Sequence, residues 1–262
     1  MEIRVLGPVE ASADGQPLPL GGAKQRAVMA MLGLEANRTV TADHLIEGLW
    51  GERAPASAPK MVQNYVWRLR SVLDGSGTAE IVTRGRGYEL RIDPDAVDAA
   101  RFQRLLAEAG RADDGGGISD AAREALSLWR GPALSDVADE PFAAPIIRWL
   151  EELKLQAAEL AVDADLAAGR HLEVVAEIEA LVEANPLRER LHAQRMLALY
   201  RCGRQGDALE AYRHARHVLV EEIGVEPGSS DGSWRRIALC RRRSSGPGST
   251  PISSTRTCRA WR

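Results

Sequence analysis

The pattern of apolar and polar residues changes near Gly22. Before it, short apolar positions alternate with charged ones, and Asp14-Gly15 is a dipeptide typical of tight hairpin turns. After it, apolar residues recur at helical spacing through "KQRAVMAMLGLEAN". The pattern therefore predicts a small antiparallel sheet followed by a first helix. The expected buried face of that helix consists of Ala27, Val28, Met31 and Leu32.

Two further helices are predicted before residue 75. Thr41 is placed to cap the second, which Gly51 ends. Ser57 is placed to cap the third, about Ser57 to Asp74, in whose first turn Pro59 is tolerated. The expected buried stripe of the second helix is Leu45, Ile46, Leu49 and Trp50.

The third helix has two chemically different faces. At roughly 100° per residue its apolar positions fall within one narrow arc, and these are Val62, Val66, Leu69 and Leu73. The opposite face carries Lys60, Asn64, Trp67, Arg68 and Ser71, with Gln63 and Arg70 on its flanks. Amide and guanidinium groups on an outward face suit the reading of base edges and the binding of phosphates. Taken alone, the same pattern also fits an ordinary solvated amphipathic helix.

A hairpin follows in "IVTRGRGYELRI", whose tip places Arg84 and Arg86 among glycines. Gly85 and Gly87 are expected to supply positive φ at the turn, and Tyr88 to pack against the hairpin base rather than touch DNA. Three short helices followed by a hairpin with a basic tip is the layout of a winged helix-turn-helix. The arginines of this wing are then placed to reach phosphates or a narrow minor groove.

Charge and composition support nucleic-acid binding by one part of the chain. Residues 57–91 hold six Lys or Arg against three Asp or Glu, whereas residues 96–227 hold 15 against 24. The acidic region is a poor binder of polyanions. No apolar run approaches the roughly 20 residues that span a bilayer, and the N-terminus lacks a signal-peptide core. We therefore expect a cytoplasmic protein, nucleoid-associated when bound to DNA, without a membrane partner.

From residue 96 to about Gly224 the sequence is helical and repeats itself. Gly169-Arg170 precedes one helical segment and Gly203-Arg204 precedes another, an offset of 34 residues. That offset is the period of tetratricopeptide (TPR) helix pairs, which stack to bury their faces. A less regular first unit is divided by a glycine loop at residues 115–117. The expected packing positions of the last segment are Ala208, Ala211, Tyr212 and Ala215.

These motifs together resemble a known family. "IVTRGRGYEL" resembles the wing of OmpR-type regulators, and "GGAKQRAVMAMLGLEANRTVTADHLIEGLWGERAPASAPKMVQNYVWRLRSVL" is similar to the same domain of actinomycete antibiotic regulatory proteins, the SARP family. The motifs "ANRTV", "LWG" and "VQxxVxRLRxxL" carry the likeness. It implies a transcription factor, usually an activator, that binds direct repeats in double-stranded DNA as a tandem dimer and contacts RNA polymerase.

The segment "LHAQRMLALYRCGRQGDALEAYRHARHVLVEEIGVEPG" resembles the bacterial transcriptional activation domain of the same family. The expected fold is thus mainly α with a small β component. It comprises a winged helix-turn-helix over residues 1–95 and a TPR-like helical repeat domain over residues 96–227. Residues 229–262 hold eight Arg and eight Ser. We therefore expect residues 228–262 to form a disordered basic tail, which is either a DNA-binding arm or an out-of-frame end.

The expected DNA-binding residues are Lys60, Gln63, Asn64, Trp67, Arg68, Arg70, Arg84 and Arg86. Trp67 departs from the family, which usually has a small polar residue there. Its ring could contact a thymine methyl or a sugar, or it could pack sideways against the wing.

Enzymatic chemistry has little support in the sequence. The three cysteines, Cys202, Cys240 and Cys258, form no metal-ligating spacing. His214 and His217 lie one helical turn apart without a third ligand, so we expect a solvated pair and no metal. No GxxxxGK[ST] motif is present, and no cofactor is expected. The competing functions are therefore a DNA-binding activator and a helical-repeat adaptor whose winged helix contacts protein.

Overall fold

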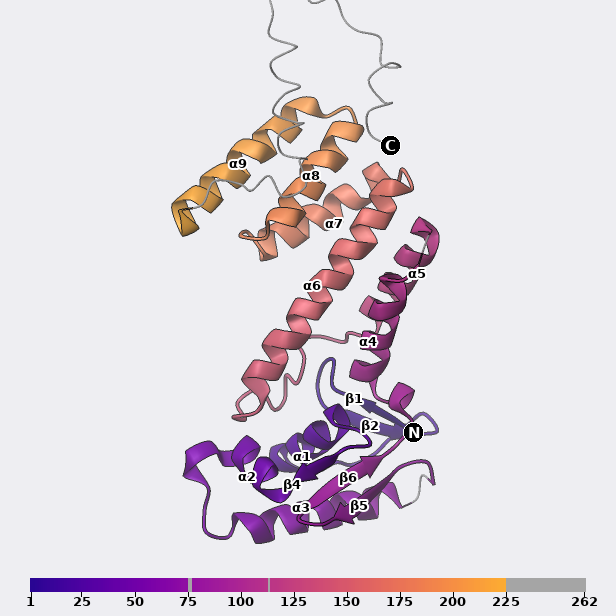
Figure 1. Cartoon of the computed structure of the whole chain (residues 1–262), viewed down its shortest axis with the longest axis vertical. Helices are drawn as coiled ribbons and strands as arrows, with labels where there is room; N and C mark the ends of the chain where they lie inside the picture. The colour runs from indigo at the N-terminus through magenta and orange to yellow at the C-terminus, as the bar shows by residue number, and fades with distance from the viewer. Residues whose placement is uncertain (75–76, 113, 225–262) are drawn as a thin grey trace, which may run out of the picture. The chain divides into compact units, whose positions relative to one another are not determined.

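The computed structural model describes residues 1–74, 77–112 and 114–224. The chain forms two compact units, Met1–Ala164 and a second beginning at Asp165 (Figure 1). Helices dominate both units and, among the described residues, the strands lie in the first, so the predicted fold class is confirmed. The tail predicted for residues 228–262 lies outside the described residues.

The first unit opens with the predicted antiparallel sheet, built from β1 (Glu2–Arg4), β2 (Glu10–Ala13) and β3 (Gln16–Pro17) in that order. Ile3 lies opposite Ala11 across the first pair. Asp14 and Gly15 form the turn with φ of 50° and 77°. Two successive positive φ values are what a tight hairpin turn needs, which explains the Asp-Gly pair.

Three helices follow, α1 (Ala23–Leu34), α2 (Ala42–Trp50) and α3 (Ala58–Leu73). Thr41 caps α2 as predicted, because its Oγ1 accepts the amide N–H of His44 at 3.1 Å. Ser57 precedes α3 but makes no capping bond to its backbone, so that predicted cap is wrong. Leu45 and Leu49 of α2 are buried, whereas its other two predicted core residues, Ile46 and Trp50, are half-buried.

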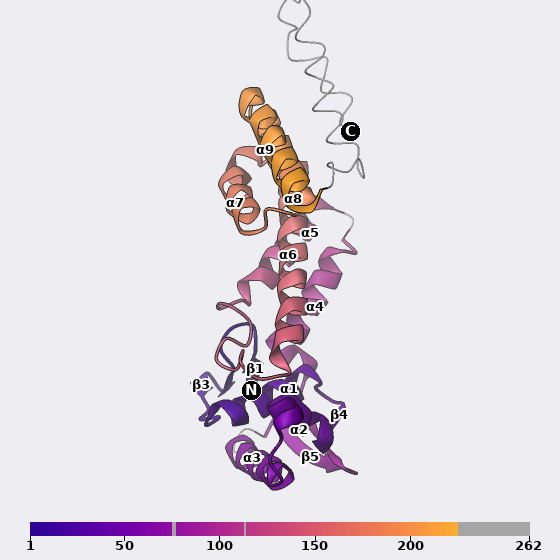
Figure 2. The same cartoon turned by 90° about the vertical axis from the view of Figure 1, so that its left-hand side faces the viewer.

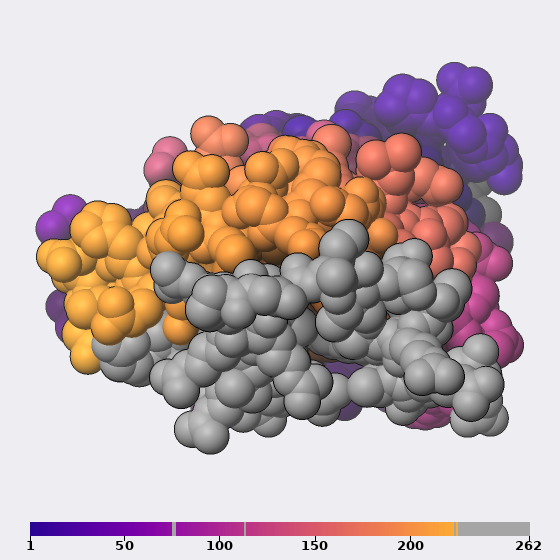
Figure 3. Space-filling model, turned by 90° about the horizontal axis from the view of Figure 1, so that it is seen from above, coloured from indigo at the N-terminus to yellow at the C-terminus, as the bar shows by residue number. Residues whose placement is uncertain are grey.

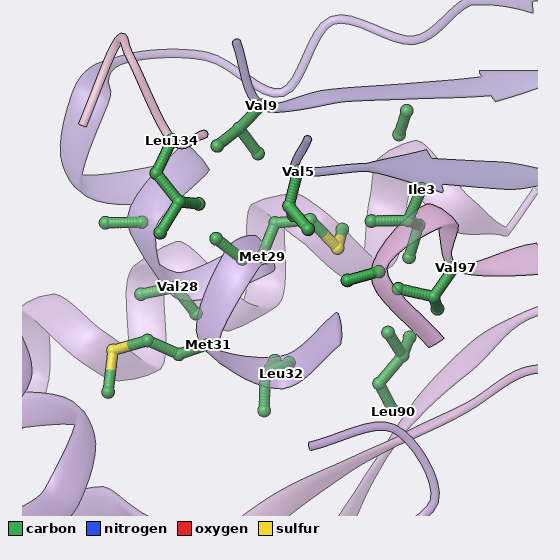
Figure 4. Close-up of a cluster of buried hydrophobic side chains, with 14 of the residues drawn as sticks. Ile3, Val5, Val9, Val28, Met29, Met31, Leu32, Leu90, Val97 and Leu134 are labelled. Carbon is green, nitrogen blue, oxygen red and sulfur yellow. The ribbon is translucent and has the colours of Figure 1, made fainter. Parts of the chain in front are cut away.

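The four predicted core residues of α1 are buried, but burial extends beyond their face, because every residue from Ala27 to Gly33 is buried. Sheet residues cover one side of α1, and residues from beyond the winged helix cover another. Figure 4 shows Met29 beside Val5 and Leu134, with Val97 beside Ile3. The core of the first unit thus continues past residue 95. The domain boundary predicted after residue 95 separates two sequence modules and stays a prediction. The division into compact units falls after Ala164 instead.

The wing consists of β5 (Glu80–Arg84) and β6 (Gly87–Arg91), and β4 (Thr39–Thr41) adds a third strand in the order β4-β6-β5. Gly85 has the predicted positive φ, at 54°. Gly87 does not, so its predicted role is wrong. Its missing side chain instead permits close approach, because a Cβ there would lie 2.4 Å from the carbonyl oxygen of Val40.

The helices after the wing are fastened to β1 and its following loop. The Asp98 carboxylate accepts the amide N–H groups of Val5 at 2.8 Å and Leu6 at 3.0 Å. The carbonyls of Leu6 and Val5 in turn accept the amides of Arg130 at 2.8 Å and Leu134 at 3.0 Å. Burial raises the pKa of Asp98, against the lowering effect of these hydrogen bonds. The backbone of residues 5–6 is thereby paired on both sides.

Asp98 begins α4 (Asp98–Ala109), which packs against α5 (Gly115–Ser127). The predicted glycine loop at residues 115–117 is wrong, since these glycines form the first turn of α5. Asp114 makes this possible, because its Oδ1 accepts the amide N–H of Gly117 at 2.6 Å and caps the helix.

The long helix α6 (Ala143–Ala167) ends where the second unit begins. That unit contains α7 (His171–Ala184), α8 (Glu189–Arg201) and α9 (Gln205–Ile223), and the surface of its last helices is orange in Figure 3. Gly169 and Gly203 both have positive φ, 85° and 79°. Arg170 and Arg204, which follow them, each donate an amide N–H over 2.9 Å to the carbonyl five residues earlier. The two sequence segments that lie 34 residues apart therefore end their preceding helices with the same backbone geometry.

Small alanine side chains line the side of α9 that is buried in the second unit. Ala208, Ala211 and Ala215 are buried as predicted, and Tyr212 is half-buried. His214 and His217 of α9 are exposed, and His214 lines a groove together with Glu179 of α7 and Arg195 of α8.

Candidate nucleic-acid interface

Helix α3 presents the two faces that its sequence predicts. Its buried face consists of Val62, Val66, Leu69 and Leu73, each at most 1% exposed. Its exposed face consists of Lys60, Gln63, Asn64, Trp67, Arg68 and Ser71. Figures 1 and 2 show α3 beside β5 at the edge of the first unit. A straight helix with a free polar face beside a hairpin is the arrangement that a major groove accommodates.

Two cations on this face have no partner in the described part of the chain. No described residue forms an ion pair or hydrogen bond with the side chain of Lys60 or Arg68. The amide of Asn64, between them on the helix, is also free of such bonds. Solvated, uncompensated cations around a free amide can bind an anionic ligand without first breaking internal contacts.

Arg70, on the flank of α3, has a different environment. Its Nε donates to the carbonyl of Ile81 at 2.7 Å, and its Nη2 donates to Oγ1 of Thr83 at 2.8 Å. The guanidinium also lies 5.9 Å from the ring centre of Tyr88. Arg70 therefore holds the helix against the wing. Tyr88 packs against the hydrophobic core, but it lies one residue pair from the hairpin tip and not at its base, so the predicted place of its packing is wrong.

Trp67 is the largest exposed apolar side chain of α3, with 66% of its surface exposed. A side chain this exposed is available to a ligand, and the two alternatives for Trp67, contact with DNA and sideways packing against the wing, stay predictions. Beside it, the Ser71 hydroxyl donates to the Trp67 carbonyl at 3.2 Å. Ser71 is thus bonded to its own helix.

The wing tip separates its two arginines. Arg84 forms an ion pair of 3.4 Å with Glu89, which also pairs with Arg91 at 3.1 Å. The hydrogen bond from Arg91, followed by the charge of Arg84, lowers the pKa of Glu89. Arg86 is exposed, and its side chain has no partner within the described residues. Of the two arginines, Arg86 is therefore the one whose guanidinium can bind a ligand without first breaking an ion pair.

The structure thus gathers Lys60, Asn64, Trp67 and Arg68 on one exposed face, and it places Arg86 at the wing tip. Gln63 is exposed beside them, whereas Arg70 and Arg84 are engaged within the protein. Sequence reasoning missed β4, which supports the wing. The Arg86 carbonyl accepts the amide N–H of Ala42 at 3.0 Å and so fixes the tip against the start of α2. The run Thr39-Val40-Thr41, rich in β-branched residues, was the available signal.

The described residues show neither a metal-binding cluster nor a membrane-spanning helix. They contain no group of three or more His, Cys, Asp or Glu side chains placed to hold a metal ion. None of their helices combines the length and apolar character needed to cross a bilayer.

Comparison with known proteins gives matches along most of the chain. Residues 15–90 match the family described as "Transcriptional regulatory protein, C terminal", and residues 97–231 match "Bacterial transcriptional activator domain". Regulatory protein AfsR of Streptomyces coelicolor is 44% identical over 227 residues, which are 85% of this chain and 22% of AfsR. Regulatory protein DnrI of Streptomyces peucetius is 38% identical over 240 residues, covering 87% of this chain and 88% of DnrI.

A solved structure is similar as well. The structure of Mycobacterium tuberculosis EmbR in complex with a low affinity phosphopeptide superposes with a TM-score of 0.86 at 36% identity. The match covers 94% of this chain and 66% of that one. The chain spans less than a quarter of the length of AfsR and most of the length of DnrI.

Proposed function

Because the chain belongs to the SARP family of transcriptional regulators, we propose that it binds specific sequences in double-stranded DNA and activates a biosynthetic gene cluster. In this proposal α3 enters the major groove and the wing reaches the neighbouring backbone. Lys60, Arg68 and Arg86 contact phosphates, and Asn64 reads a base edge. Arg70 acts by positioning, because its donors already bond the wing.

The observation that carries this proposal is the set of free polar groups on α3 and the wing tip. Buried cations with internal partners would give up those bonds on binding, whereas Lys60, Arg68 and Arg86 have none to give up among the described residues. An amide such as Asn64 forms a paired hydrogen bond with adenine in the major groove. Cations flanking an amide therefore provide position and specificity on one surface.

Binding as a dimer on direct repeats is the second part of the proposal. Two chains side by side on one face of the duplex require repeats about one helical turn apart, about 10 to 11 base pairs. In the activator role, the DNA-bound pair contacts RNA polymerase. Mapping the genomic sites that the chain occupies tests both statements, through the spacing of the repeats and their distance from promoters.

A salt titration is the direct test of DNA binding. Phosphate neutralisation makes log affinity fall linearly with log salt, by about 0.9 for each phosphate neutralised. The full chain is expected to show a steep slope on random duplexes and a tighter, specific complex on its selected site. Absence of any complex at low salt would remove the proposal.

A protein-contact adaptor remains the second candidate, favoured by one feature of the second unit. A groove of about 680 Å³ lies between α7, the turn after it and α9, with Val182, Pro186, Leu187 and Val218 among its lining residues. In an adaptor this groove would bind protein, and the affinity for DNA would be negligible at every salt concentration.

A further inference from the structure

The exposed indole of Trp67 lies among polar groups that favour a polyanion. Trp67 is 66% exposed, and it shares its face of α3 with Lys60, Asn64 and Arg68. Large aromatic side chains bury 150–250 Å² each on binding, about enough to dominate a local contact. A ligand for this face must therefore be anionic overall and apolar at one point.

We propose that Trp67 determines base specificity by contacting the methyl group of a thymine in the major groove. The inference rests on the proposed function, since it requires α3 to enter the groove. It specifies one base that the protein recognises, a thymine, and the group of that base that is contacted, the methyl carbon.

Neighbouring residues leave the ring of Trp67 free for this contact. The flank of α3 that faces the wing is occupied by Arg70, whose guanidinium bonds Ile81 and Thr83. Ser71, one turn further on, has its hydroxyl bonded to the Trp67 carbonyl. Most of the Trp67 surface is therefore open to a ligand, whereas the guanidinium of Arg70 is already bonded to the wing.

The chemistry of the major groove selects thymine as the target. Base edges there present hydrogen-bond donors and acceptors, and the thymine methyl is the one apolar group in that pattern. Indole has a single N–H donor and no acceptor, so Trp67 is poorly suited to reading the polar pattern. Its apolar surface is complementary to the methyl group.

The helix fixes where this thymine should lie. Trp67 follows Asn64 by three residues, which is about 4.5 Å along the helix axis, and successive base pairs are about 3.4 Å apart. The thymine contacted by Trp67 should therefore lie within about two base pairs of the base read by Asn64.

Deoxyuridine substitution tests the inference, since deoxyuridine pairs as thymidine does and lacks only the methyl group. The full chain first selects its site from a random duplex pool, and each thymine of that site is then replaced singly. We expect one thymine per half-site whose replacement weakens binding about fourfold, the transfer value of one buried carbon. Trp67→Ala should abolish this sensitivity, and Trp67→Phe should restore part of it. Leu172→Ala, at a position of α7 that is 77% exposed, should keep all of it.

Three outcomes would overturn the inference. Strong wild-type binding that is indifferent to every deoxyuridine would place the ring on a sugar instead. Wild-type sensitivity retained by Trp67→Ala would assign the methyl contact to another residue. A change in the oligomeric mass of the DNA-free protein caused by Trp67→Ala would place Trp67 in a contact between two copies. Failure to bind any duplex is distinguishable from these, because it removes the proposed function and the inference together.

Discussion

Arg70 and Thr83 join α3 to the wing through a hydrogen bond of 2.8 Å from the guanidinium Nη2 to the hydroxyl Oγ1. A second bond, from Nε of Arg70 to the carbonyl of Ile81 at 2.7 Å, reaches the same strand. The helix and the hairpin are therefore held at a defined angle. A protein that inserts one element into a groove and lays the other along the backbone needs this geometry before it meets DNA.

The first prediction follows from that clamp. Arg70→Met should lower the free energy of unfolding by about 1.5 kcal/mol, because both hydrogen bonds have a charged donor. Arg68→Met, on the same helix but without a partner in the described structure, should change it by less than about 0.5 kcal/mol. Urea denaturation measures both. Equal effects of the two substitutions would show that the clamp contributes nothing.

The second prediction separates base reading from phosphate binding. Asn64→Ala should cost about 1 to 3 kcal/mol on the selected site and little on random duplex, because Asn64 has no charge to neutralise a phosphate. Fluorescence anisotropy on both duplexes measures the difference. Leu172→Ala is the control, since Leu172 is exposed on α7 and lies outside the proposed interface. Equal losses on both duplexes for Asn64→Ala would remove that residue from base recognition.

The third prediction compares the two arginines of the wing tip. Arg86→Ala should weaken binding to specific and random duplexes alike and lower the salt slope by about 1. Arg84→Ala should lower the slope less, because its guanidinium is already paired with Glu89 at 3.4 Å. Affinity measured across a salt series gives both slopes. The opposite ranking would mean that the Arg84–Glu89 pair opens on DNA.

The fourth prediction concerns pH and the second unit. His192 is buried on α8, and its Nε2 donates to the Pro186 carbonyl at 2.7 Å. Burial lowers the pKa of His192, and the neighbouring His214 and Arg195 lower it further, against the raising effects of the hydrogen bond to Pro186 and of the Glu189 charge. The folded state then favours the neutral ring. Its stabilisation is complete above the unfolded pKa, about 6.5, and is lost as pH falls through the lower folded pKa.

Thermal unfolding followed by circular dichroism between about pH 7.5 and pH 5 tests this statement. The midpoint should fall with decreasing pH, and His192→Gln should flatten part of that fall. His44→Gln, at an exposed position of α2, serves as the control and should keep the wild-type dependence. An unchanged pH dependence in His192→Gln would show that another group is responsible.

The elements of the winged helix could be predicted from sequence where local rules suffice. The stripe from Val62 to Leu73 follows from helical period, and the Thr41 cap follows from side-chain geometry. Burial all around α1 could not be predicted, because it depends on residues such as Leu134 that are distant in sequence. Propensity and period carry no information about such partners.

The candidate site divides in the same way. The exposure of Asn64 and Trp67 follows from their helix position. The bonds of Arg70 and Arg84 depend on how the hairpin is registered, with Thr83 opposite Tyr88, and a pattern of residue types does not fix that pairing. Their DNA-binding roles, like those of the other predicted residues, stay predictions.

The last prediction concerns Gly87, whose φ is not positive but whose Cα lies too close to β4 to carry a side chain. A Cβ at Gly87 would lie 2.4 Å from the Val40 carbonyl oxygen, so Gly87→Ala must displace β4 from β6 and should cost about 2 kcal/mol of unfolding free energy. Gly85→Ala meets no atom within 4 Å but keeps a φ of 54°, which costs about 1 kcal/mol. Gly206→Ala, within α9 and in open space, should stabilise by about 0.5 kcal/mol. Denaturation that ranked Gly85→Ala as the most harmful of the three would show that the turn, and not the approach of β4, limits the wing.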